Sequence, residues 1–147
     1  MRPILTLCLF GVSLLGAISP ASAATKAKGT AINGSTTLRG MTGSCVCDQR
    51  WYRVGLRPGA GAVQVKLVTT ASSTVPSYGL RASLMQGTME LDGGQVVCTR
   101  KQRPCLKTIT LKYRVSKPAI YSILVYGVSA EGISYTLRVR GKTYNLR

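Results

Sequence analysis

The sequence contains no histidine, and only four of its 147 residues carry a carboxylate. Without histidine, neither the Ser-His and Cys-His pairs that activate nucleophiles nor histidine metal sites can form. The carboxylates are Asp48, Glu90, Asp92 and Glu131. They are too few and too scattered to supply the about six to eight oxygen ligands that calcium takes. An enzyme is therefore the least favoured class, and no cofactor or metal site is expected.

Glu90 and Asp92 are close enough in sequence to share one side of a strand. Such a pair could serve a glycosidase only if both carboxylates were buried in a cleft. Asp92 is followed by Gly93 and Gly94, which is turn chemistry, so we expect two solvated charges at the end of a hairpin. We also expect Asp48 to close a local turn or to pair with Arg50 or Arg53. No catalytic residue is predicted, although a hydrolase with an unrecognised site stays open because serines and lysines are plentiful.

No apolar run reaches the about 20 residues that a membrane-spanning helix needs. The longest run, Ile4 to Ile18, follows the positive charge of Arg2 and precedes the small residues 21–23. This order is typical of a secretory signal, with residues 1–23 removed by cleavage near Ala23-Ala24. The sequence therefore predicts a secreted or periplasmic protein without a transmembrane segment.

About 124 residues remain after such a cleavage, enough for one domain with an ordinary core. Residues 24–34 are small and polar with two lysines, so we expect a flexible lead-in there. The folded domain is then predicted to occupy residues 35–147.

Positive charge is the strongest compositional feature of the chain. The 20 Lys and Arg residues oppose four acids, which gives a formal net charge of +16, and only Arg2 lies in the expected signal. This excess is larger than solubility requires of a small domain. It favours a polyanionic partner such as an acidic glycan, an envelope polymer or a nucleic acid.

Four cysteines follow the expected signal: Cys45, Cys47, Cys98 and Cys105. An even number in an exported chain favours disulfides. A thiolate metal site is the alternative, but the spacings differ from the usual C-x2-C pairs. Cys45 and Cys47 would point to one side of a strand, too far apart to bond each other comfortably. We therefore favour two long-range bridges that join them to Cys98 and Cys105.

Hydrophobic residues after the signal alternate with polar ones at a period of two. The pattern is clear over 63–67, 108–115 and 135–140, and it indicates strands with one face in a core and one in water. The segment 119–128 is apolar on both faces, as expected of a central strand. Turn chemistry separates these runs, and no amphipathic helix is evident. The sequence predicts an all-β fold, an antiparallel, jelly-roll-like β-sandwich of about seven to eight strands.

Two groups of cations are candidate binding surfaces. The first is a loop that Cys98 and Cys105 enclose, and it carries Arg100, Lys101 and Arg103. A constrained loop loses less entropy on binding than a free tail. The second group has outward strand positions and consists of Arg53, Arg57, Lys112, Arg114, Arg138 and Arg140. If their strands share a sheet they form one cationic face, with Trp51 or Tyr144 available for stacking. Otherwise they only discourage edge-to-edge pairing.

The order of several segments resembles bacterial pre-peptidase C-terminal domains. These segments are Trp51-Tyr52-Arg53-Val54, Pro58-Gly59-Ala60-Gly61, 78–84, 109–115, 118–127 and 132–137. The resemblance covers about residues 35–141 and implies a jelly-roll-like sandwich that assists secreted hydrolases without catalysis. Some members of that family bind calcium through acids, but Gly79 and Arg81 stand in the matching places here. The resemblance therefore implies no calcium site in this chain.

Three classes of function stay open at this point. A non-catalytic accessory or binding module with a polyanionic or glycan partner is favoured. A structural or secretion-assisting domain without a specific ligand is the first alternative, and a hydrolase is the second.

Overall fold

In a computed structural model, the chain folds into strands without a helix over residues 29–34, 37–42, 48–68, 77–99, 101–102, 104–128 and 132–147, which are the residues that the structure describes. The strands are β1 (Thr30–Ile32), β2 (Thr37–Met41), β3 (Arg50–Leu56), β4 (Gly59–Val68), β5 (Ser77–Gln86), β6 (Met89–Thr99), β7 (Thr108–Val115), β8 (Ala119–Gly127), β9 (Ser134–Arg140) and β10 (Thr143–Tyr144). The expected all-β sandwich is confirmed, with two very short strands among the ten.

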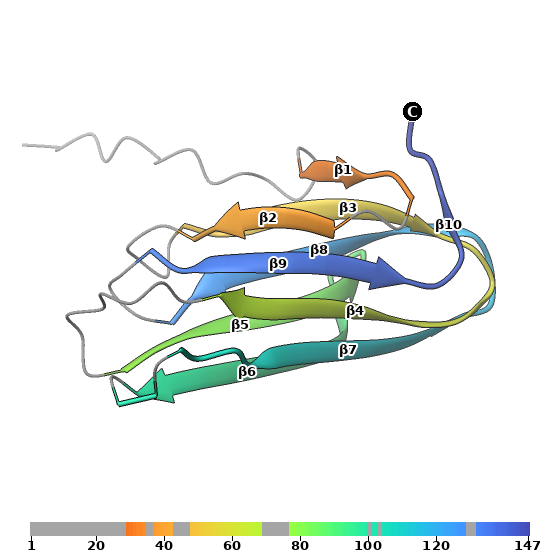
Figure 1. Ribbon diagram of the computed structural model, residues 1–147. Helices are drawn as coiled ribbons and strands as arrows, with labels where there is room; N and C mark the ends of the chain where they lie inside the picture. Colours follow the sequence, from red (N-terminus) through yellow and green to blue (C-terminus); the bar gives the residue numbers. More distant parts are fainter. Residues whose placement is uncertain are drawn as a thin grey trace, which may run out of the picture.

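The strands form two facing sheets, which Figure 1 shows as a front and a back layer. Sheet A has the order β1-β3-β8-β5-β6, and β10 also pairs with β3. Sheet B has the order β2-β9-β4-β7. All pairs are antiparallel except β1 with β3.

Consecutive strands rarely lie in the same sheet. Only β5 and β6 form a hairpin within one sheet, and every other connection between the strands described here passes from one sheet to the other. The turn at Arg57 and Pro58 makes one such crossing, and the turn at 116–118 makes another. As a result, sheet B collects strands from four distant parts of the sequence.

The inward positions of both sheets form one core. Sheet B contributes Val63, Val65, Ile109, Leu111, Leu137 and Val139, and sheet A contributes Val54, Leu80, Leu84, Ile123 and Val125, all at most 4 % exposed. Two tyrosines meet inside this core, where the hydroxyls of Tyr52 and Tyr135 lie 2.7 Å apart. Burial and this hydrogen bond raise the pKa of the Tyr135 hydroxyl. The alternation in the sequence thus matches the two surfaces of each sheet.

The clearest sequence patterns appear as strands. The runs over 63–67, 108–115 and 135–140 lie in β4, β7 and β9 of sheet B. The segment 119–128 supplies β8, which is a central strand between β3 and β5 as expected. Its outward face is only partly covered, because Ile120 is 50 % exposed.

The expectation of a turn at residues 92–94 was wrong. Asp92, Gly93 and Gly94 do not form a turn; they lie within β6, beside a bulge in the β5–β6 pairing. The hairpin turn stands instead at Gly87, whose φ of 58° suits glycine, and Thr88. A side chain at position 94 would collide with Ile109 of the facing sheet, so this glycine provides room for packing.

The expected flexible lead-in at 24–34 also includes ordered chain. Residues Thr30–Ile32 form β1 and pair in parallel with β3, and Ile32 is only 1 % exposed. The ordered domain thus begins before residue 35. Residues 1–28, with the expected signal, lie outside the described part of the chain. The described part contains no helix that could span a membrane.

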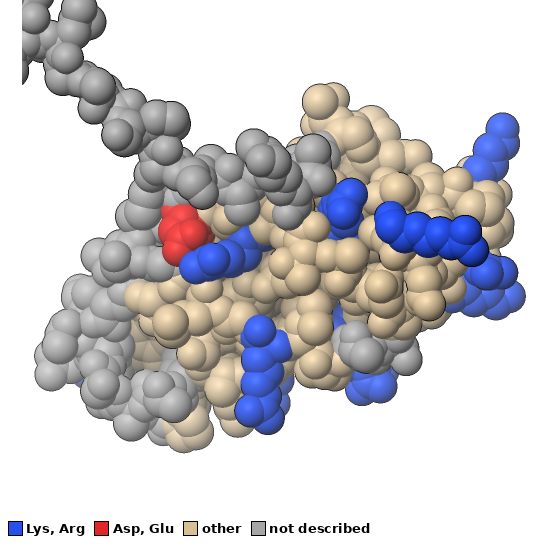
Figure 2. Space-filling model, turned by 90° about the horizontal axis from the view of Figure 1, so that it is seen from above, with Lys and Arg blue, Asp and Glu red and all other residues tan. Residues whose placement is uncertain are grey.

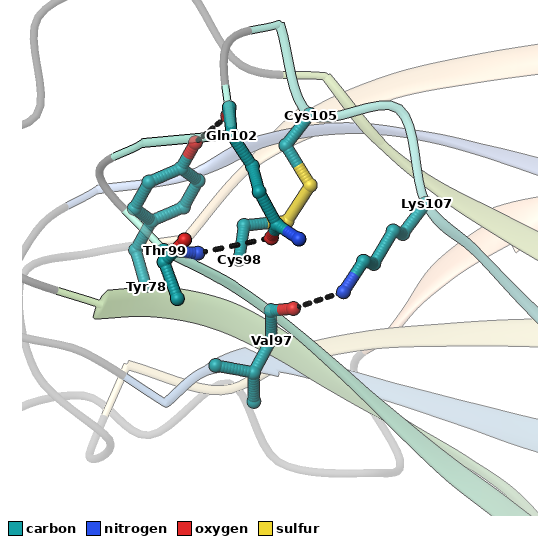
Figure 3. The surroundings of a disulfide bond; sticks show 7 residues. All are labelled: Tyr78, Val97, Cys98, Thr99, Gln102, Cys105 and Lys107. Atoms are coloured by element: carbon teal, nitrogen blue, oxygen red, sulfur yellow. Dashed lines mark hydrogen bonds between the residues drawn. A yellow bond between two sulfur atoms is a disulfide. The ribbon is translucent and has the colours of Figure 1, made fainter.

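The disulfide differs from the favoured pairing. Cys98, at the end of β6, is bonded to Cys105, which precedes β7, and the two Cα atoms are 6.3 Å apart (Figure 3). Both cysteines are buried, and the short loop between them turns back through a Gln102 N–H to Thr99 C=O hydrogen bond of 2.9 Å. The local return of the chain therefore joins these two sulfurs directly. Cys45 and Cys47 lie outside the described residues.

Candidate polyanion-binding face

Six basic side chains point outward from sheet B, and all six are exposed. They are Arg39 on β2, Lys66 on β4, Lys112 and Arg114 on β7, and Arg138 and Arg140 on β9. We call this set the cationic face. Because β2, β9, β4 and β7 are neighbours in that order, the six residues share one surface of one sheet.

The pairing register sets their spacing across the sheet. Lys112 and Arg140 both pair with Ala62, one from each side of β4. Neighbouring strands lie about 4.8 Å apart, so the backbones of these two cations are about 10 Å apart. Lys66 and Arg39 flank Thr136 in the same way, with β9 between them. In both pairs, one strand lies between the two cations and presents a small or hydroxyl-bearing residue between them.

The outward residues of β4 between the cations of β7 and those of β9 are uncharged. Ala60 pairs with Arg114, Ala62 lies between Lys112 and Arg140, and Gln64 pairs with Arg138. We call Ala60, Ala62 and Gln64 the β4 strip. The long basic side chains on β7 and β9 thus rise on both sides of a strip that carries no charge.

Two of the described carboxylates, Asp48 and Asp92, belong to or precede strands of sheet A, and Asp92 reaches the β7 edge of the cationic face. The carboxylate of Asp48, which precedes β3, forms an ion pair of 3.1 Å with Arg50, the first residue of β3 in sheet A. Asp92 on β6 accepts hydrogen bonds from the backbone N–H groups of Gly93 and Lys112. In the view of Figure 2, basic side chains are spread over the surface and acidic atoms occupy one small area. Among the described residues, no carboxylate forms an ion pair with a side chain of the cationic face.

A hollow of about 650 Å³ adjoins the cationic face at the end of β2 and β9. Its lining consists of Arg39, Gly40, Met41, Val68, Ser134, Tyr135 and Thr136. The lining is mostly apolar, and it includes the side chain of Met41, which is 61 % exposed. Arg39 belongs both to the hollow and to the cationic face.

Four of the six strand cations expected to form one surface do so. Lys112, Arg114, Arg138 and Arg140 meet on sheet B. Arg53 lies in sheet A, where its Nε donates to the Gly29 carbonyl at 3.2 Å and ties β3 to the chain before β1. Arg57 lies in the turn between β3 and β4. These two do not belong to the face.

The aromatic residues expected beside the cations lie elsewhere. Trp51 is a half-buried residue of β3 in sheet A, and the Tyr144 ring covers Gly55 of the same strand. Sheet A is the opposite layer of the sandwich, so stacking by these two next to the cationic face was a wrong expectation.

The loop between Cys98 and Cys105 is described only in part. Lys101 is exposed, whereas Arg100 and Arg103 lie outside the described residues. Gln102 anchors the loop, since its side-chain Oε1 accepts from the Thr99 N–H at 3.2 Å and its carbonyl accepts from the Tyr78 hydroxyl (Figure 3). The three loop cations therefore stay a prediction.

Sequence reasoning missed Arg39 and Lys66. Lys66 stands at an outward position of a clearly alternating run, so the alternation itself was a signal for it. Arg39 lies in β2, a strand of five residues with two glycine or threonine positions and little apolar content, which gave no comparable signal. The β4 strip was also missed, because Ala60 and Ala62 acquire meaning only from the neighbouring strands.

Acidic side chains and cysteines lie apart from one another in the described part of the chain. No three Cys, Asp or Glu side chains among them gather as a group that could hold a metal ion. Glu90 is exposed on β6, and Asp92 is engaged with backbone N–H groups, so they are not a buried acid pair. Burial raises the pKa values of the Tyr113 and Tyr135 hydroxyls above the ordinary tyrosine value.

Comparisons with known proteins find similarity to solved structures. No family model matches the sequence. No curated protein matches it either. Among solved structures, the chain is similar to the periplasmic inhibitor of g-type lysozyme from Aeromonas hydrophila, at 14 % identity and a TM-score of 0.46, over 76 % of this chain and 93 % of the inhibitor. It is also similar to the mitogen derived from Yersinia pseudotuberculosis, at 12 % identity and a TM-score of 0.40, over 76 % of this chain and 88 % of the mitogen.

A further solved structure is the pre-peptidase C-terminal domain of a collagenase from Bacillus anthracis. It shares 17 % identity with this chain at a TM-score of 0.52, over 76 % of this chain and 93 % of that domain. At this identity the likeness concerns the fold alone. The resemblance found in the sequence is therefore confirmed at that level: this chain has a fold similar to that of a pre-peptidase C-terminal domain.

Proposed function

We propose that this protein is an exported, non-catalytic binding module that holds a polyanion on the cationic face of sheet B. The observation that carries the proposal is the gathering of six exposed cations from four strands on one surface, none of which forms an ion pair with a described carboxylate. Such a surface concentrates anions near it and binds them by many charge contacts at once.

Export is supported from two sides. Residues 1–23 have the order of a cleavable signal. The Cys98–Cys105 disulfide fits an oxidising compartment, which the periplasm and the extracellular space provide.

The solved domain of similar fold is a part of a collagenase, which supports an accessory role for this module beside a secreted enzyme.

Retention on a sulfated polysaccharide resin at about 0.15 M salt tests the binding itself. Each neutralised charge releases about 0.7 to 0.9 counterions, so five or six contacts give a log–log slope of roughly −3.5 to −5 between affinity and salt. Joint substitution of Lys112, Arg114, Arg138 and Arg140 by glutamine should reduce that slope by about 3.

A matched control removes the same charge from other surfaces. Arg57, Arg81, Lys117 and Arg147 are exposed and stand outside the cationic face, so their joint change to glutamine should leave most of the slope in place. Equal losses in both quadruple variants would show that net charge alone causes retention. A separate variant of Arg100, Lys101 and Arg103 measures the loop, which should contribute about 2 to the slope if it also binds.

A further inference from the structure

The cationic face is organised around β4, and this arrangement bears on the shape of the ligand. Lys112 and Arg114 line one side of the β4 strip, and Arg138 and Arg140 line the other. The strip itself carries no charge, and Lys66 follows it at the next outward position of β4. A chain lying along β4 would therefore meet cations on both sides and the uncharged side chains of Ala60, Ala62 and Gln64 beneath it.

The uncharged residues on this surface include four threonines. Thr37, Thr108, Thr110 and Thr136 occupy outward positions of sheet B, with Gln64 between Thr110 and Arg138. Hydroxyl and amide groups both donate and accept hydrogen bonds, as sugar hydroxyls do. Arginine guanidinium groups pair well with carboxylate, sulfate and phosphate. The face thus offers partners for charged and hydroxyl groups together.

Aromatic side chains are missing from the outward positions of β2, β4, β7 and β9. Proteins that bind single-stranded nucleic acids gain about 1–3 kcal/mol per base from aromatic stacking. The outward aromatics Trp51 and Tyr126 belong to β3 and β8 of sheet A. The surface that carries the cations therefore has no stacking platform for bases.

We infer that the polyanion is a single-chain acidic glycan that lies along β4 between the cations of β7 and β9; this inference rests on the proposed function. From Ala60 to Lys66 the strand advances six residues, which at about 3.4 Å per residue gives a contact about 20 Å long. Affinity should rise with glycan length until the ligand spans this distance and then level off.

The experiment compares heparin-derived oligosaccharides of increasing length with oligo-dT strands of equal charge at one salt concentration. We expect the sulfated oligosaccharide to bind at least tenfold more tightly than the DNA strand. The variant Ala62→Leu adds bulk between Lys112 and Arg140 without a change of charge, and it should weaken glycan binding at least tenfold. Gln95→Leu, at an exposed position of β6 in sheet A, is the control and should bind as the parent does.

Each outcome bears on one of the two proposals. If Ala62→Leu keeps its melting temperature and the parent affinity while the quadruple cation variant loses binding, the face binds polyanions but not along β4, and the inference is overturned. Equal or tighter binding of oligo-dT, or of duplex DNA, overturns the choice of a glycan. Absence of binding to every polyanion defeats the proposed function itself.

Discussion

Three tyrosines of this protein pack over glycines on the neighbouring strand, directly opposite in the register. Tyr135 covers Gly40, Tyr144 covers Gly55 and Tyr113 covers Gly61. A Cβ atom at any of the three glycines would overlap the ring. The rings thus lie flat across the adjacent strand and fill space that a side chain would otherwise take.

The pair formed by Tyr113 and Gly61 lies next to the proposed binding site. The ring crosses β4 at Gly61, and its hydroxyl donates to the carbonyl of Arg140 on β9 at 3.0 Å. This hydrogen bond ties together the two strands that flank the β4 strip. The position of the Arg140 backbone therefore depends on the absence of a side chain at residue 61.

Gly61→Ala should destabilise the protein by about 1–3 kcal/mol, the usual cost of overpacking a core. The added methyl group would meet the Arg140 carbonyl, which is backbone and cannot rotate away, and the Tyr113 hydroxyl. Chemical denaturation measures the change in the free energy of unfolding. Ala60→Ser on the exposed side of the same strand is the control, and we expect a change below about 0.5 kcal/mol for it. Parent-like stability of Gly61→Ala would mean that the tyrosine moves freely.

The edge formed by β6 and β7 shows how elements of different sheets are joined. Three contacts connect them: the Cys98–Cys105 disulfide, the Lys107 ammonium donating to the Val97 carbonyl at 2.6 Å, and the Asp92 carboxylate accepting from the Lys112 N–H at 2.7 Å. The last two occupy backbone groups that edge strands leave open. They also hold β7, which carries two cations of the face.

Replacing Cys98 and Cys105 together by alanine should lower the free energy of unfolding by about 2.5 kcal/mol, the loop-entropy value for so short a closed loop. Equilibrium denaturation of the oxidised parent and of the double variant measures this difference. Peptide mapping without reductant should recover the two segments joined in the parent. Fragments that join residue 45 or 47 to residue 98 or 105 would contradict the bridge.

At the level of elements, the sequence was informative where side chains alternate strongly. The runs in β4, β7 and β9 could be predicted as strands, because large apolar residues alternate there with polar and charged ones. Within β6, Gly93 and Gly94 imitated a turn, since glycine that makes room for Ile109 looks the same as glycine that bends a chain. The three-residue β1 and two-residue β10 are too short for any period to appear.

The composition of the site could be predicted, but not its assembly. Outward arginines and lysines follow from alternation, as at Arg138 and Arg140. Which of them meet depends on strand order, and here almost every connection changes sheet. The partners of β4 are β7 and β9, about 45 and 75 residues away in the chain, and no local pattern encodes that pairing.

Across the whole molecule, the two outer surfaces differ in character. The outer face of sheet B carries six exposed cations among threonines and small residues. The outer face of sheet A carries half-buried Trp51, Leu124 and Tyr126 and the exposed Ile120. More of the positive charge carried by strands thus lies on sheet B, since the strands of sheet A carry only Arg50, Arg53 and Arg81.

This distribution makes the pH dependence of binding a test of the whole scheme. Histidine is the side chain whose ordinary pKa lies between pH 5 and 8, and this chain has none. The proposed contacts use lysine and arginine alone. Affinity for a sulfated oligosaccharide, whose own charge stays constant, should therefore change less than about threefold between pH 5 and 9, since one unit of pKa coupling already corresponds to about tenfold.

The measurement should stop below pH 10, because the fold itself becomes sensitive there. Burial raises the pKa of the Tyr135 hydroxyl, so the folded state favours the protonated form. The resulting contribution to the free energy of unfolding is fully present below the ordinary tyrosine pKa of about 10, and it is lost as the pH rises above that value. Titration calorimetry at fixed ionic strength gives the affinities, and the melting temperature at each pH shows that the protein remains folded. A bell-shaped or sigmoidal profile within the tested range would indicate that a group other than the lysines and arginines of the cationic face controls binding.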